Sequence, residues 1–194
     1  MIPNYNFLII KKSSYFISIT NDTHRASIKD SFHCFIIGAG KSTLVFRMLR
    51  NAERLFIGGP PFNILYSYGV HQSLYEEMER VIPNMLFIQG LPSETTLANL
   101  IANKGTAILV LDDLMDQVSS SKEAEKLFSQ GAHHRGLYVI YINQNLFYKA
   151  PRTRSIALNT HYQFLMKSFR DVSQIKYFSR QVFPDNPDAL MRAY

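Results

Sequence analysis

Residues 33–43 read His-Cys-Phe-Ile-Ile-Gly-Ala-Gly-Lys-Ser-Thr, an apolar segment followed by a glycine turn, a lysine and two hydroxyl residues. Phe35, Ile36 and Ile37 favour a buried β-strand, and the apolar residues of segment 44–50 recur at helical spacing. The turn therefore lies between a strand and the N-terminus of a helix. There the unpaired backbone N–H groups and the helix dipole favour an anion, so the pattern predicts a phosphate-binding loop.

The residues of the loop predict specific contacts with a nucleotide. We expect Lys41 on the β- and γ-phosphates of ATP and the Ser42 hydroxyl on Mg²⁺. The predicted cofactor-binding residues are Gly38, Ala39, Gly40, Lys41, Ser42 and Thr43. However, the motif G-x-x-x-x-G-K-[ST] requires a glycine five places before Gly40, where this chain has Phe35. A shorter loop offers fewer N–H groups to a phosphate. Considered without the rest of the chain, this stretch could also be an ordinary strand-to-helix turn.

Length and composition indicate one globular domain. The chain has 194 residues, of which 46% are hydrophobic and 19% charged. Its formal net charge of +6 suits a polyanionic partner such as nucleic acid or a nucleotide. Cys34 is the single cysteine, which excludes an internal disulfide and indicates a reducing compartment. No apolar run has the length of a membrane span, so we expect a soluble intracellular protein, nuclear or cytoplasmic, without a membrane partner.

From residue 32 onwards, strand-like segments alternate with helical ones. The expected strands are 32–37, 63–68, 85–89, 106–111, 137–142 and 162–166, and the expected helices are 41–51, 73–80, one capped by Ser93, 122–130 and 172–180. The alternation predicts an α/β fold with a doubly wound, mostly parallel sheet and helices on both faces. Residues 31–194 form the predicted domain. Residues 1–30 are an extension whose two short apolar runs could form a hairpin or no stable structure.

Two aspartates follow the continuous apolar run 106–111, which is typical of a central parallel strand. Because open α/β sheets bind ligands at the carboxyl ends of their strands, we expect both carboxylates beside the phosphate loop. Asp112 is predicted to hold Mg²⁺ through its water shell, and Asp113 to act as the general base for the attacking water. The alternative is that the two aspartates lie in a solvated turn. The Gly-Lys-Ser turn earlier in the chain favours the nucleotide site over this alternative.

Amide side chains follow the next strand at the same edge. Gln144 or Asn143 could contact the γ-phosphate or the attacking water, or could cap the turn that follows. Arg135, just before this strand, could serve a neighbouring subunit as an arginine finger and is our third predicted catalytic residue beside Asp113 and Gln144.

Several strings along the chain resemble one family of motor proteins. They are 38–43, 108–113, 127–135, 141–147, 155–162, 170–171 and 179–184. In these strings the chain is similar to the viral DNA-packaging ATPases of Polinton (Maverick) elements and adintovirus-type viruses. Those belong to the FtsK/HerA class of P-loop NTPases, with poxvirus-type packaging ATPases as distant relatives. The strings His133-His134-Arg135 and Gln144-Asn145-Leu146-Phe147 are not general P-loop features.

The resemblance implies a P-loop NTPase fold and a homo-oligomeric ring that couples ATP hydrolysis, with Mg²⁺, to the translocation of double-stranded DNA into a capsid. It implies that Lys41 and Ser42 bind ATP and Mg²⁺, that Gln144 senses the γ-phosphate, and that Arg135 acts in trans. Three features depart from the family. The family loop Gly-Pro-Thr-Gly-x-Gly-Lys lacks its first three residues here, residues 1–30 do not look like the family, and relatives continue beyond Tyr194. We therefore expect a domain truncated at its C-terminus.

Two other functions stay open. A catalytically impaired, element-derived remnant would keep the fold and bind nucleotide, DNA or subunits, and it differs from the motor at the shortened loop alone. A small-molecule P-loop kinase is less favoured, because the sequence has no Arg-rich lid. Lys149, Arg152 and Arg154 form a basic cluster that could contact a DNA backbone or lie in a solvated loop.

Overall fold

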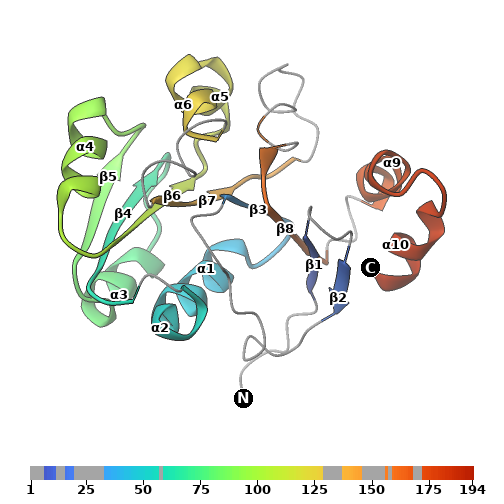
Figure 1. Ribbon diagram of the computed structural model, residues 1–194, viewed down its shortest axis with the longest axis horizontal. Coiled ribbons are helices and arrows are strands. Elements are labelled where there is room, and N and C mark those ends of the chain that lie inside the picture. Colours follow the sequence, from blue (N-terminus) through green and yellow to red (C-terminus); the bar gives the residue numbers. More distant parts are fainter. Residues whose placement is uncertain are drawn as a thin grey trace.

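The computed structural model describes residues 7–11, 16–19, 33–56, 59–128, 137–145, 156, 159–167 and 172–194. An eight-stranded sheet in the order β2-β1-β8-β3-β7-β6-β4-β5 forms its centre (Figure 1). Its strands are β1 (Phe7–Lys11), β2 (Phe16–Ile19), β3 (His33–Ile37), β4 (Phe62–Tyr68), β5 (Met85–Gln89), β6 (Thr106–Asp112), β7 (Leu137–Ile142) and β8 (Tyr162–Met166). The strands from β8 to β5 are all parallel, and β1 and β2 extend the sheet beyond β8 as an antiparallel pair.

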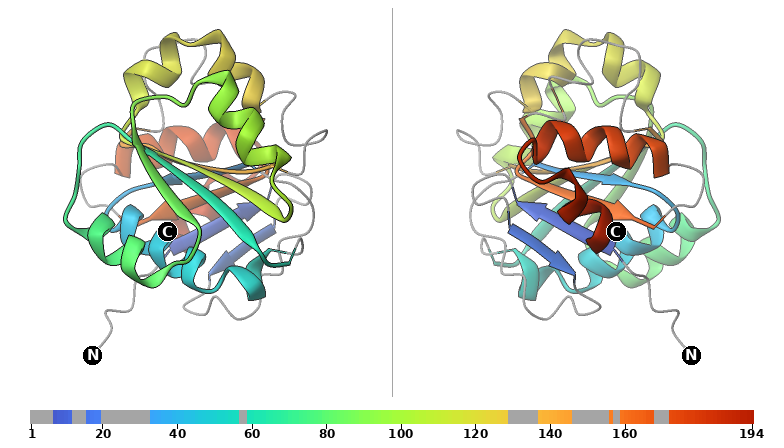
Figure 2. Two further views of the ribbon diagram at one scale, coloured as in Figure 1. Left: turned by 90° about the vertical axis from the view of Figure 1, so that its left-hand side faces the viewer. Right: turned by 90° about the vertical axis from the view of Figure 1, so that its right-hand side faces the viewer.

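Helices cover both faces of the sheet (Figures 1 and 2). They are α1 (Lys41–Arg50), α2 (Ala52–Leu55), α3 (Leu74–Val81), α4 (Glu94–Ala102), α5 (Met115–Ser120), α6 (Lys122–Lys126), α9 (Val172–Val182) and α10 (Pro187–Ala193). The first three pack on one face, and the others pack on the opposite face. The predicted α/β fold, a parallel sheet flanked by helices, is thus confirmed.

Each face of the sheet has its own apolar core, because successive side chains of a strand point to opposite sides. In β6, Ile108 and Val110 belong to the core beneath α1 and α3, while Leu109 and Leu111 belong to the core beneath α4, α5, α6, α9 and α10. All seven residues of this strand are buried. Asp112 continues the series of Ile108 and Val110, so the strand directs its side chain toward the α1 and α3 face.

Most predicted elements are present, with small changes at their ends. β5, β7 and β8 have the predicted bounds, and β6 is one residue longer because Asp112 pairs within the sheet. Ser93 caps α4 as expected, since its Oγ accepts a hydrogen bond from the Thr96 N–H at 3.1 Å. The helix expected over 122–130 is present as α6, from Lys122 to Lys126.

The structure also contains elements that the sequence analysis missed or left open. The two N-terminal runs form the hairpin of β1 and β2, and β1 pairs with β8. Helices α2, α5 and α10 were not predicted. All three are short, and α5 buries only Val118 and α10 only Leu190, so they hold too few apolar residues to define a helical repeat.

The register of the parallel strands aligns their carboxyl ends. Ile36 of β3 pairs with Ile142 of β7, and Ile142 pairs with Asp112 of β6. On the other side of β6, Tyr68 of β4 pairs with Asp112. The loops after β3, β7, β6 and β4 therefore leave the sheet side by side, at the edge where open α/β sheets bind ligands.

Candidate functional site

The turn between β3 and α1 consists of Gly38, Ala39 and Gly40. Gly38 has a φ of 105° and Gly40 a φ of 79°, values that residues with a Cβ atom rarely adopt. A Cβ atom on Gly38 would also overlap the backbone carbonyl of Met166, at the end of the neighbouring strand β8. The turn can therefore be this tight only with glycine in its first position.

The first turn of α1 presents Lys41 and Ser42, the two side chains that the sequence predicts to contact a nucleotide. Lys41 Nζ donates a hydrogen bond to the Gly38 carbonyl oxygen at 2.8 Å, so the ammonium group folds back over the turn. Ser42 Oγ donates to Asp112 Oδ2 at 3.0 Å. The first N–H groups of a helix have no partner within it, and the helix dipole adds positive potential there. An anion at this end of α1 would therefore meet backbone N–H groups, the Lys41 ammonium group and the Ser42 hydroxyl.

Asp112 is a buried carboxylate that three hydroxyl groups contact. It is 2% exposed, and besides Ser42 its Oδ2 accepts hydrogen bonds from the Tyr66 hydroxyl at 2.6 Å and the Tyr75 hydroxyl at 3.1 Å. Burial raises the pKa of both tyrosines well above the ordinary value, and the charge of Asp112 raises it further, so both remain protonated donors. These donors offset the cost of burying a charge. Neither tyrosine was predicted from the sequence: the one signal for Tyr66 is a polar-tipped aromatic residue within a buried strand, and Tyr75, in helix α3, has no such signal.

Asp113 leaves β6 in a left-handed conformation, with a φ of 56°. Its Oδ1 accepts a hydrogen bond from Gln144 Nε2 at 2.8 Å. The neighbouring Asn143 is buried, and its Oδ1 accepts a hydrogen bond from the Gln144 backbone N–H at 2.7 Å. Of the two amides considered from sequence, Gln144 thus reaches Asp113, whereas Asn143 shapes the turn after β7.

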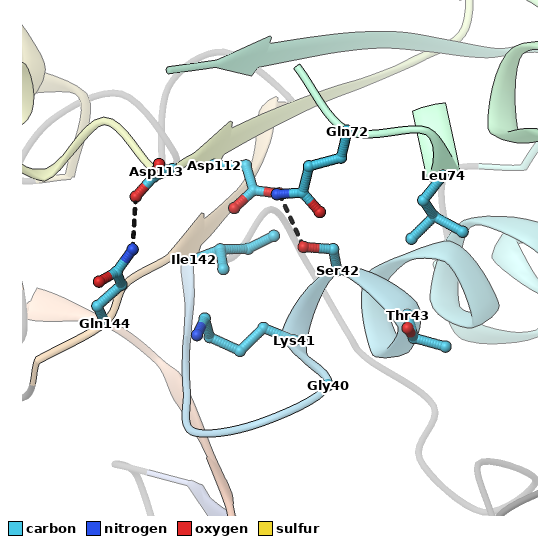
Figure 3. A pocket seen from close by; sticks show the side chains of 10 residues that line it. All are labelled: Gly40, Lys41, Ser42, Thr43, Gln72, Leu74, Asp112, Asp113, Ile142 and Gln144. Atoms are coloured by element: carbon cyan, nitrogen blue, oxygen red, sulfur yellow. Dashed lines mark hydrogen bonds between the residues drawn. The ribbon is translucent and has the colours of Figure 1, made fainter. Parts of the chain in front are cut away.

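The residues of the site surround a cavity of about 300 Å³ at the carboxyl edge of the sheet (Figure 3). It is lined by Gly40, Lys41, Ser42, Thr43, Gln72, Leu74, Asp112, Asp113, Ile142 and Gln144. In Figure 3, Gln144 and Asp113 lie on one side of Ser42, and Thr43 lies on the other.

The cavity brings together most of the predicted site residues. Gly38 and Ala39 do not line it, although they form the turn below, and Arg135 lies outside the described residues. Three lining residues were not predicted: Gln72 from the connection between β4 and α3, Leu74 at the start of α3, and Ile142 at the end of β7.

The donors in the cavity fit Mg²⁺ bound together with phosphate. The Ser42 hydroxyl and the carboxylates of Asp112 and Asp113 are hard oxygen ligands, which Mg²⁺ prefers. In the part of the chain that the structure describes, no group of three or more His, Cys, Asp or Glu residues could hold a metal by itself. Mg²⁺ in phosphate sites takes one or two protein ligands and fills its other positions with phosphate and water, a pattern that this site can supply.

No protein-family model, curated protein or solved structure matches the chain. Among the described residues, no helix has both the length and the apolar character that a membrane crossing requires. The interpretation of the cavity therefore depends on its geometry and on the sequence motifs.

Proposed function

We propose that this chain is a P-loop ATPase. The observation that supports this best is the convergence of Lys41, Ser42 and Asp112 on one cavity, with the hydrogen-bonded pair of Asp113 and Gln144 beside them. These residues lie at or just after the carboxyl ends of three neighbouring parallel strands, β3, β7 and β6. Phosphoryl transfer to water requires a cation on the phosphates, a metal-holding carboxylate and a group that positions the water. The cavity contains a residue for each requirement.

Each residue has a role that follows from its place. Lys41 moves from the Gly38 carbonyl oxygen to the β- and γ-phosphate oxygens. Ser42 and Asp112 hold Mg²⁺, which when bound neutralises negative charge on the phosphates. Asp113 accepts a proton from the attacking water. Gln144, whose amide reaches Asp113 Oδ1, orients that water.

We propose further that hydrolysis drives the translocation of double-stranded DNA, as the resemblance to Polinton packaging ATPases implies. The chain would then act as a homo-oligomeric ring, with capsid proteins as further partners. Acidic residues outnumber Lys and Arg in residues 59–128, which form β4, β5, β6 and α3 to α6 on one side of Figure 1. In the other described segments taken together, Lys and Arg outnumber the acidic residues. Such a charge difference supports contact between unlike sides of successive protomers.

Two predictions attached to the motor concern residues outside the described part of the chain. They are the arginine finger, Arg135, and the basic cluster of Lys149, Arg152 and Arg154. Neutralising the three cluster residues together should flatten the salt dependence of DNA binding, and an unchanged slope would reject their contact with the phosphate backbone.

One observation favours a second candidate, the catalytically impaired remnant. Gly38, Ala39 and Gly40 alone separate β3 from α1, and Lys41 donates a hydrogen bond across this turn. So short a turn presents few N–H groups to a β-phosphate, which lowers the affinity for ATP. The chain would then act as a module that binds nucleotide, DNA or subunits.

The decisive test compares the unaltered chain with a version in which Gly-Pro-Thr is inserted after Ile37. Both are assayed for Mg·ATP binding by calorimetry and for phosphate release, with Lys41→Ala and Asp113→Asn made in each. The ATPase proposal expects binding and turnover in the unaltered chain and loss of binding in Lys41→Ala. It expects Asp113→Asn to keep binding while turnover falls about 10²–10⁴-fold.

The outcomes separate the candidates. Binding and turnover in the lengthened version alone support the remnant. No binding in either version rejects the nucleotide site, and normal turnover in Asp113→Asn places the base elsewhere. For the motor, linear double-stranded DNA should increase turnover, and a turnover that DNA leaves unchanged rejects translocation while the ATPase stands.

A further inference from the structure

Hydroxyl groups from three elements donate to one oxygen of Asp112. Ser42 belongs to α1, Tyr66 to β4 and Tyr75 to α3, and all three donate to Oδ2. No residue in the described part of the chain donates a hydrogen bond to the other oxygen, Oδ1. Asp112 lines the cavity, so Oδ1 is the acceptor that this carboxylate keeps for a ligand there.

Aromatic packing fixes the two tyrosine hydroxyls. The rings of Tyr66 and Tyr75 lie 4.9 Å apart between centroids, and Phe87 packs against them at 5.2 Å and 5.4 Å. Both tyrosines are buried, at 0% and 2% exposure. Because the interior is close-packed, neither ring can turn its hydroxyl away from Asp112 without disturbing its neighbours. The donors are therefore in place before any ligand binds.

We propose that Tyr66 and Tyr75 are positioning residues, a hydroxyl clamp that orients Asp112 so that its Oδ1 serves the divalent cation of the nucleotide site. This inference rests on the proposed ATPase function. The clamp also acts on Ser42, because the Ser42 proton is directed to Oδ2 and the lone pairs of its oxygen are left for the cation. Groups that orient metal ligands typically change metal affinity about 10–100-fold when they are removed.

Phenylalanine substitutions separate positioning from simple structural support. Tyr66→Phe and Tyr75→Phe keep the rings against Phe87 and remove only the donors. A structural role predicts lower folding stability with unchanged cation binding, whereas positioning predicts weaker cation binding. Tyr141→Phe is the matched control: this tyrosine is also buried, in β7, and its hydroxyl has no hydrogen-bond partner among the described residues.

The experiment uses the full chain and N-methylanthraniloyl-ATP as a fluorescent probe. Mg²⁺ is titrated at a fixed probe concentration, and probe binding is measured separately in EDTA. We expect the Mg²⁺ concentration for half-maximal binding to rise about tenfold in each single variant, with metal-free affinity within about twofold of the unaltered chain. Tyr141→Phe should leave both quantities unchanged. Protection of the buried Cys34 from a thiol reagent verifies that each variant is folded.

Each outcome bears on the proposal. An unchanged Mg²⁺ midpoint in the folded variants, with probe binding intact, overturns the clamp and leaves the ATPase proposal standing. Failure of the unaltered chain to bind the probe at any Mg²⁺ concentration overturns the nucleotide site and the clamp together. If Tyr66→Phe does not fold, Tyr75→Phe decides the question alone. The Tyr75 hydroxyl makes the longer of the two hydrogen bonds, so its removal should destabilise the fold less.

Discussion

Replacing Gly38 by alanine should destabilise the fold and disable the turn proposed to bind phosphate. The φ of 105° at Gly38 is strained for any residue with a Cβ atom. That atom would also overlap the backbone carbonyl of Met166, on strand β8, which pairs with β3 next to the turn. A backbone carbonyl cannot rotate away as a side chain can. The turn itself must therefore move away from β8.

Two contributions determine the size of the effect. A left-handed conformation costs a residue other than glycine about 1–2 kcal/mol, and overpacking adds about 1–3 kcal/mol. The free energy of unfolding should then fall by about 2–5 kcal/mol. For a domain of this size each kcal/mol lowers Tm by about 2–4 °C, so Tm should fall by roughly 4–20 °C.

Two other glycines provide matched controls. Gly105 has a φ of 116°, and a Cβ atom there would overlap the Pro61 carbonyl oxygen, but it precedes β6, at the sheet edge opposite the cavity. Gly105→Ala should cost as much stability as Gly38→Ala and leave the site intact. Gly90 has a φ of 83°, and the atom nearest to an added Cβ is Gln117 Oε1 at 3.5 Å. Gly90→Ala therefore tests strain without overlap, at about 1–2 kcal/mol.

Urea unfolding followed by circular dichroism measures the three costs, and calorimetry measures ATP binding by the variants that remain folded. The expected result is similar destabilisation by Gly38→Ala and Gly105→Ala, a smaller effect of Gly90→Ala, and loss of ATP affinity in Gly38→Ala alone. If alanine at position 38 is as harmless as alanine at position 90, the turn does not pack against β8 and the reasoning is refuted.

Tyr141→Phe should raise the free energy of unfolding by about 1 kcal/mol, because it removes a buried hydroxyl without a hydrogen-bond partner among the described residues. Lower stability in urea would contradict this. Cys34 should react with a thiol reagent only after unfolding, since it is buried and burial raises the pKa of its thiol above the ordinary 9.0. The stability linked to this thiol is complete below pH 9.0 and declines above it, because on raising the pH the Cys34 thiol loses its proton in the unfolded chain before it does so in the folded chain. Rapid labelling of Cys34 in the native chain at neutral pH would exclude the buried position. Ser93→Ala should cost about 1 kcal/mol of stability by removing the cap of α4, and an unchanged urea midpoint would argue against that cap.

The parts of the site that lie directly after a strand could be predicted from the sequence. Lys41 and Ser42 follow an apolar run through a glycine turn, and Asp112 and Gln144 come at or just after the ends of two other apolar runs. In a parallel sheet the carboxyl ends of the strands share one edge, so residues far apart in the chain come together there. A local pattern and one general rule of topology were therefore sufficient.

The proposed hydroxyl clamp could not be predicted in this way. Tyr66 and Tyr75 are 46 and 37 residues from Asp112 in the chain. Their hydroxyls meet its carboxylate because β4 lies beside β6 and α3 packs on the same face, and neither fact can be deduced from the residues near Asp112. The choice between Asn143 and Gln144 had a similar limit. Neighbouring residues at a strand end differ in direction, and the sequence did not indicate which one would reach Asp113.

The carboxylate half of the candidate site is assembled although the turn proposed to bind phosphate is short. Ser42 Oγ lies 3.0 Å from Asp112 Oδ2, so α1 begins at the right level relative to β6. A shift of one residue along the helix would move this hydroxyl by about 1.5 Å along the axis and rotate it by about 100°, which would break the contact. The short turn therefore limits the backbone proposed to bind a phosphate and leaves the placement of α1 unaffected. It follows that inserting Gly-Pro-Thr after Ile37 should lengthen the turn while the Ser42–Asp112 contact persists, and the resulting gain in ATP affinity would measure what the longer loop contributes to binding.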